Sequence, residues 1–197
     1  MRSFWGQQWV WVAVSLVWLL SLSVLLYVPG QSDFWFILFA YAPAFAAYLY
    51  LLRKGGQLPF RAGIALAVLA RLIAVPAWPL LSDDVYRFIW DGHLLVQGYN
   101  PFAQLPAYYL ALPEPPQGIS EALYEQLNSP SYFTIYPPLA QGVFALGAWL
   151  FPNSWYGHAV VIKLFLLACE LGVVALLPAL LRHIGLPAQR AMIYLLN

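Results

Sequence analysis

Long runs of apolar residues alternate with short polar connections along most of the chain. A helix needs about 20 mostly apolar residues to cross a bilayer. Five apolar runs approach this length, at residues 9–28, 35–52, 60–81, 135–151 and 158–181. A sixth run begins at residue 187 and extends to residue 197. The pattern predicts an all-α polytopic membrane protein with about five to six transmembrane helices. We expect residues 1–197 to form a single membrane module, because no repeat or soluble domain interrupts the runs.

The longest break in this pattern is a proline- and tyrosine-rich loop at residues 82–134. Its first part has the punctuation of a short helix. Ser82 or Asp83 can cap the start by accepting backbone N–H bonds, and Gly98, with an Asn-Pro pair behind it, can close the end. A second amphipathic piece is expected near residues 120–127. We predict a large exoplasmic loop that bears amphipathic helices on the membrane surface.

Three charged residues of the first loop helix are expected on one face. Asp84, Arg87 and Asp91 are spaced i, i+3 and i+7, which places them on the same side of a helix. Pairing of Arg87 with Asp91 is the favoured interpretation for Asp91. The helix then presents an acidic edge at the bilayer surface, and we predict the functional site there.

The composition agrees with a membrane protein and excludes one soluble core. Hydrophobic residues make up 62% of the chain and charged residues 9%, against about 25% charged in soluble domains. The mean hydropathy is +0.70. The net charge of +1 predicts no nucleic-acid partner, because such partners require a strongly basic surface.

The basic residues predict the orientation, because short cytoplasmic loops are rich in Lys and Arg. Arg2 lies at the N-terminus, and Arg53, Lys54 and Arg61 lie between the second and third runs, whereas the first connection carries only Asp33. We therefore expect a cytoplasmic N-terminus and an exoplasmic loop in the plasma (inner) membrane.

The rest of the chain tests this orientation in two ways. The loop carries six acidic residues and one arginine, a net charge of −5, which suits a translocated segment. Arg182 and Arg190 oppose the orientation, because in this order of spans they flank an outside turn.

Three charges fall inside apolar runs: Arg71, Lys163 and Glu170. Each would be costly if it faced lipid. Packing within the helix bundle is the simpler interpretation. A role in moving a substrate is the alternative, and it motivates a transporter or lipid flippase as the second hypothesis for function.

The sequence SDDVYRFIWDG, followed by GYNPF and later by TIYPPLAQ, resembles the polytopic GT-C glycosyltransferases. The likeness is strongest to mannosyltransferase-like members that use a polyprenyl-phosphate sugar. It extends from about residue 81 to residue 140. The residues that match that pattern are Asp83, Asp84, Tyr86, Asp91, Gly98, Asn100, Pro101, Phe102, Tyr136, Pro137 and Pro138. His93 departs from it, since members often carry arginine after Asp-Gly. The chain is also shorter than a complete enzyme of this class, and we expect it to be the N-terminal portion of one.

The resemblance implies transfer of a hexose, mannose first, from the lipid phosphate to an acceptor hydroxyl, with inversion at the anomeric carbon. The acceptor could be a glycan, a lipid or a protein. Asp83 is the implied general base, with an ordinary helix cap as the alternative. Asp84 could orient Asp83, bind acceptor hydroxyls or hold a metal, or could be a solvated charge. Mg²⁺ or Mn²⁺ at Asp83 and Asp84 stays open.

The remaining candidates are predicted to bind substrate, each with a structural alternative. Arg87 could bind the lipid phosphate as a bidentate donor or only pair with an aspartate. Asp91 and His93 could touch substrate, although an ion pair and a surface histidine are the simpler interpretations. Tyr136 could donate its hydroxyl to the donor phosphate or anchor the chain at the membrane interface. A third hypothesis is a non-catalytic membrane subunit.

Overall fold

The computed structural model describes residues 2–53 and 59–197, with side chains from residue 9 onward. Met1, Lys54 and the side chain of Arg2, used above to predict the orientation, lie outside this description. Helices make up 68% of the chain, and no strand occurs in the described ranges. The prediction of an all-α protein is therefore confirmed. The chain divides into two compact units: unit 1 is Met1–Leu80 with Leu167–Asn197, and unit 2 is Leu81–Leu166.

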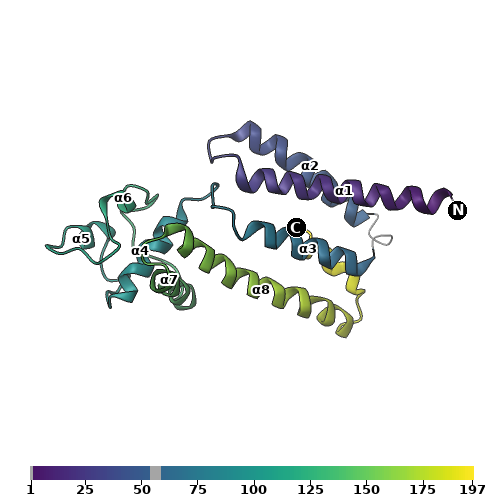
Figure 1. Ribbon diagram of the computed structural model, residues 1–197. Coiled ribbons are helices and arrows are strands. Elements are labelled where there is room, and N and C mark those ends of the chain that lie inside the picture. The colour runs from purple at the N-terminus through teal and green to yellow at the C-terminus, as the bar shows by residue number, and fades with distance from the viewer. Residues whose placement is uncertain (1, 54–58) are drawn as a thin grey trace. The chain divides into compact units, whose positions relative to one another are not determined.

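Unit 1 is built mainly from long helices (Figure 1). It contains α1 (Arg2–Tyr27), α2 (Phe34–Arg53), α3 (Phe60–Ala74), the second part of α8 (Trp155–His183), the 3₁₀ turn η1 (Ala188–Ala191) and α9 (Met192–Leu195). Within the described residues, three segments are long and apolar enough to cross a membrane: Trp9–Tyr27, Phe34–Arg53 and Trp155–His183. These helices support a membrane-embedded protein, and the number of spans stays a prediction.

Two predicted spans form shorter helices than their apolar runs indicate. The helix α3 ends at Ala74, because Pro76 and Pro79 cannot donate the backbone hydrogen bonds that would extend it. The helix α7 (Pro138–Leu150) has 13 residues, fewer than the roughly 20 that a bilayer crossing needs. The length of an apolar run in the sequence therefore does not fix the length of the helix in these two segments.

Three arginines of unit 1 gather at one of its ends. Arg53 closes α2, and Arg182 lies in the last turn of α8. Arg190 lines a pocket together with Arg53 and with Phe60, the first residue of α3. Figure 1 shows the end of α2, the start of α3 and the end of α8 at the same end of this unit. The expectation that Arg182 and Arg190 lie on the opposite side from Arg53 is wrong, because α8 runs antiparallel to α3.

A hydrogen-bonded cluster around Arg71 ties α3 to α8 and α9. Its Nε and Nη2 atoms donate to Oε2 of Glu170 at 3.0 and 2.9 Å, and its Nη1 donates to the carbonyls of Ala67 at 3.2 Å and Leu195 at 2.8 Å. The Tyr194 hydroxyl donates to the other Glu170 oxygen at 2.7 Å. The packing interpretation of Arg71 and Glu170 is confirmed, since each charge is satisfied inside the unit.

Unit 2 is organised around α4 (Asp84–Val96), which packs against α7. The unit also contains α5 (Pro106–Leu110), α6 (Glu121–Tyr124) and the first part of α8. The ring of Phe88 stacks on Phe144 with centroids 4.5 Å apart. The two helices approach closely at Gly92, where an added Cβ would collide with the Phe144 carbonyl.

The prediction that α4 lies on a surface with an acidic edge needs correction. Arg87, Asp91 and His93 are all buried, and among the charged residues at this helix only Asp83 and Asp84 keep partial exposure. The physical reason is that α7, α8 and the loop segments of unit 2 cover α4, so its polar side chains face protein groups. The second amphipathic piece forms α6, whose start is capped by Ser120 accepting from the Leu123 N–H at 3.3 Å.

Candidate functional site

The ends of α4 follow the signals in the sequence. The Ser82 hydroxyl accepts from the Asp84 N–H at 3.3 Å, whereas the Asp83 side chain makes no cap bond. At the other end Gly98 has φ +78°, a conformation that glycine adopts without strain. The N–H groups of Gly98 and Tyr99 donate back into the last turn of the helix, which satisfies two terminal carbonyls. This capped helix holds the candidate residues in fixed register.

A buried polar network joins α4 to the start of α7. Arg87 Nε donates to Asp91 Oδ1 at 2.9 Å, and Arg87 Nη1 donates to the Tyr132 carbonyl at 3.0 Å. The second Asp91 oxygen accepts from the Thr134 hydroxyl and from Gln141 Nε2, the latter at 2.8 Å. Asp91 is 0% exposed and Arg87 3%. The predicted pairing of these two residues is confirmed, and the network anchors the segment that follows residue 128 against α4.

A pocket of about 520 Å³ opens beside this network within unit 2. Asp84, Arg87 and Tyr136, three residues selected from the sequence, line it. The other lining residues are Asn128, Ser129, Tyr132, Phe133, Thr134 and Ile135. Asn128 Nδ2 donates to Asp84 Oδ1 at 2.9 Å, so the carboxylate is held at the wall. The pocket therefore combines a carboxylate, a guanidinium and a phenol.

The guanidinium of Arg87 is held in place by hydrogen bonds that involve two of its three nitrogen atoms. Its Nε and Nη1 atoms are bonded to Asp91 and to backbone carbonyls. Its Nη2 makes no hydrogen bond to the described part of the protein. Because Arg87 lines the pocket, this remaining donor can serve a bound anion.

Tyr136 stands in an aromatic setting at the same pocket. Its ring meets Phe88 edge-on with centroids 4.9 Å apart and Phe144 with centroids 5.6 Å apart. Burial, with the Asp84 carboxylate adding to it, raises the pKa of the Tyr136 hydroxyl. The phenol therefore stays protonated near neutral pH and can donate a hydrogen bond.

Three of the predicted site residues do not line this pocket. Asp83 precedes α4 half-exposed, and Asp91 lies behind Arg87 in the buried network. His93 is 5% exposed and lies against Gly118, where an added Cβ would meet its ring. The interpretation of His93 as a surface histidine is wrong, and its burial away from the pocket gives no support to a phosphate contact.

Asn128, Thr134 and Gln141 were not selected from the sequence, yet they shape the site. His158, also not selected, packs against Gly92 of α4 and Gly147 of α7. Gln141 gave a usable signal, because it is the one strongly polar side chain in the apolar run 135–151. His158 is fully buried next to His93, with ring centroids 6.2 Å apart. Its role could not be seen in the sequence, where it only begins an apolar run.

The carboxylates near the pocket could supply few ligands to a metal ion. Across the described residues, no group of three or more His, Cys, Asp or Glu side chains is placed to hold a metal ion. Asp84 alone of the Asp pair lines the pocket. Mg²⁺ is commonly held by one or two carboxylates together with water and substrate phosphate, so Asp84 could supply one such ligand.

We expect the buried His93 to make the protein less stable in acid. Burial lowers the pKa of the His93 imidazole, so the unfolded chain takes up a proton more readily than the folded protein. The neutral His93 side chain gives its full contribution to the free energy of unfolding above about pH 6.5, the pKa of histidine in the unfolded chain. This contribution is lost as the pH falls below that value. Unfolding midpoints in detergent at about pH 7.5 and about pH 5 measure this loss. The loss should shrink in His93→Gln, and an unchanged loss would contradict the prediction.

Comparisons of the chain with protein-family models, with curated proteins and with solved structures gave no match.

Proposed function

We propose that the pocket beside α4 is the active site of a GT-C-type glycosyltransferase that uses a polyprenyl-phosphate hexose. The observation that carries the proposal is the meeting of Asp84, Arg87 and Tyr136 at one pocket. Asp84 and Tyr136 belong to the ordered motif that resembles this class, and Arg87 lies within its first part. Tyr136 follows the loop, 49 positions after Arg87. Their meeting in space supports a shared role in one reaction.

Asp84 is the residue best placed to act as the general base. Its carboxylate lines the pocket and is oriented by Asn128, whereas Asp83 does not line it. In the proposed step the carboxylate takes the proton of an acceptor hydroxyl. The hydroxyl oxygen forms a bond to the anomeric carbon of the hexose, and the bond from that carbon to the phosphate oxygen breaks. The electron pair leaves with the lipid phosphate, and the configuration at the anomeric carbon is inverted.

Arg87 and Tyr136 are the proposed partners of the leaving phosphate. Charge develops on the phosphate oxygen as the bond breaks, and fixed donors that face this oxygen stabilise the transition state. The Nη2 atom of Arg87 and the protonated Tyr136 hydroxyl are donors of this kind. The ion pair with Asp91 has a positioning role here, because it holds the guanidinium in one orientation.

The proposed location is the exoplasmic side of the plasma (inner) membrane, with a cytoplasmic N-terminus. The clustering of Arg53, Arg182 and Arg190 at one end of unit 1 supports it, since the cytoplasmic ends of membrane helices are rich in basic residues.

A transporter or flippase is the alternative function. It was motivated by the charges inside the apolar runs, and a translocation path would need some of them to face the substrate. The mutual satisfaction of Arg71 and Glu170 favours a packing role for that pair and so weakens this motivation. A non-catalytic subunit is a further alternative, which the assay below separates.

The test is an assay of sugar transfer in nanodiscs. Polyprenyl-phosphate hexoses, mannose first, are offered with membrane glycolipids and peptides as acceptors, with and without a chelator. We expect transfer by the protein, in this form or in a longer natural form that contains it. Asp84→Asn should reduce the rate at least about a hundredfold, the lower range for loss of a general base.

The matched control is Glu114→Gln, which removes an exposed acid of the same loop and should leave the rate unchanged. A full loss in Asp83→Asn with normal transfer by Asp84→Asn would move the base to Asp83. Movement of lipid donor across liposomes without transfer, or a folded protein with neither activity, would refute the glycosyltransferase proposal.

A further inference from the structure

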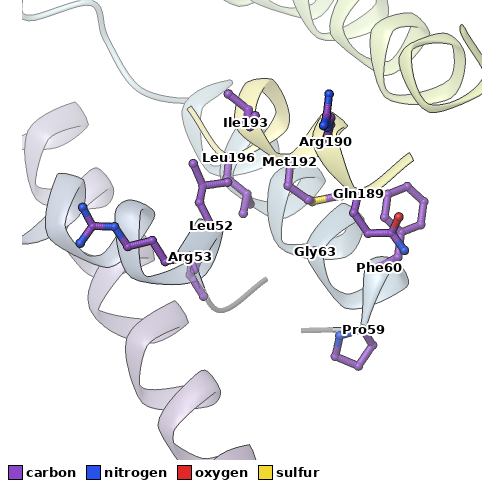
Figure 2. Close-up of a pocket in the computed structure, with 11 residues that line it drawn as sticks. Leu52, Arg53, Pro59, Phe60, Gly63, Gln189, Arg190, Met192, Ile193 and Leu196 are labelled. Carbon is purple, nitrogen blue, oxygen red and sulfur yellow. The ribbon is translucent and has the colours of Figure 1, made fainter. Parts of the chain in front are cut away.

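A second pocket, of about 350 Å³, lies within unit 1 at the basic end. The end of α2, the start of α3 and the segment η1–α9 surround it (Figure 2). Its lining is mostly apolar, with Leu51, Phe60, Met192 and Leu196 among the residues that form it. An apolar pocket at the end of a membrane helix is suited to a hydrocarbon chain.

Two arginines stand at the edges of this pocket. Arg53 comes from α2 and Arg190 from η1. Figure 2 shows the two guanidinium groups at different edges of the pocket, each pointing away from Met192 in the middle. In the part of the chain that the structure describes, neither guanidinium forms an ion pair. An anionic group at the rim could therefore pair with either arginine.

The charged residues that line the pocket, Arg53 and Arg190, are both basic. Arg61 and Arg182 belong to the same end of unit 1, and the eight acidic residues of the chain lie elsewhere in the sequence: Asp33 between α1 and α2, Glu170 beside Arg71, and the other six at residues 83–125. A basic rim above an apolar floor complements a ligand with an anionic head and an apolar tail.

We infer that this pocket binds an anionic membrane phospholipid, with its headgroup at the basic rim that carries Arg53 and Arg190 and one acyl chain on the apolar floor. The position of the pocket agrees with this occupant, because Arg53 ends a segment long enough to cross the membrane. Basic side chains at that depth attract anionic headgroups, which are enriched at the cytoplasmic leaflet. This inference rests on the membrane character of the protein and on the proposed cytoplasmic side of this end, and it is independent of the proposed glycosyl transfer.

The test is native mass spectrometry of protein released from nanodiscs that contain equal amounts of phosphatidylglycerol and phosphatidylcholine. We expect phosphatidylglycerol to be retained in preference to phosphatidylcholine. The double variant R53Q/R190Q should retain about tenfold less or lower, given the attraction that each basic residue contributes. The variant R182Q is the matched control, because Arg182 is an exposed arginine of the same end that does not line the pocket. R53K/R190K keeps the charge and should keep most of the retention.

A variant that narrows the pocket distinguishes binding in the pocket from general attraction of lipid to a charged surface. Leu52 lines the pocket, and Leu52→Trp should reduce retention without any change of charge. Equal retention of the two lipids, equal loss in R182Q and R53Q/R190Q, or full retention by Leu52→Trp would each overturn the inference. So would a longer natural form of the protein that retains no lipid, because the pocket would then be covered by protein.

Discussion

Replacing Arg87 with methionine is expected to lower the free energy of unfolding by about 3–5 kcal/mol, the range for removing one partner of a buried ion pair. Asp91 is fully buried, and Arg87 is its one cationic partner among the side chains that the structure describes. In the variant its carboxylate keeps the Thr134 and Gln141 donors but lies uncompensated in an apolar interior. The Tyr132 carbonyl also loses its donor.

Denaturant unfolding in mild detergent, followed by tryptophan fluorescence, measures this loss. The control is the double variant R87M/D91L, which removes both charges. Replacement of a buried pair by apolar residues is often neutral, so the double variant should regain much of the stability lost in R87M. A double variant less stable than R87M, or an R87M protein as stable as the wild type, would contradict this view of the network.

Placing a methyl group on Gly147 is expected to destabilise the protein by about 1–3 kcal/mol, the usual range for overpacking. A Cβ at this position would lie 2.6 Å from Cδ2 and 2.9 Å from Nε2 of His158. The imidazole is fully buried and cannot move aside freely, because Gly92 of α4 closes its other side.

Gly142 provides a matched control in the same helix. A Cβ added there meets no atom within 4 Å, and alanine is favoured over glycine in helices by about 1 kcal/mol. We therefore expect Gly142→Ala to be neutral or stabilising in the unfolding measurement that shows Gly147→Ala to be damaging. The double variant G147A/H158A should show a favourable coupling energy. Equal effects of the two glycine substitutions would rule out the close contact with His158.

The local structure of α4 was predictable because its signals are close in sequence. Ser82 and Gly98 mark its ends, and the helical spacing of Arg87 and Asp91 predicts their ion pair. The burial of Asp91 was not predictable in this way, since its other partners, Thr134 and Gln141, are brought in by the packing of α7. The sequence of α4 alone, without these two partners, predicts a helix with a solvated acidic edge.

The site was predicted in part for a related reason. The sequence selected Asp84, Arg87 and Tyr136, which the fold brings to one pocket, and it also selected Asp83, which does not line that pocket. The two neighbours have the same chemistry, and only the direction of each side chain from the helix start separates them. The side of the membrane on which Arg182 lies was not predictable from the sequence either. It depends on the number of crossings before Arg182, and therefore on whether the apolar run at 135–151 crosses the membrane.

Because Arg87 is buried with Asp91, the charged side chains that remain in the loop at residues 82–134 are all acidic. Five carboxylates remain outside the pair, and the loop contains no other lysine or arginine. The long-range field of this surface attracts cations and repels anions, including anionic headgroups. Salt limits its reach to about 8 Å at physiological ionic strength. A cationic acceptor would therefore be drawn toward the pocket, whereas a phosphate must come close enough to reach Arg87 before it is attracted.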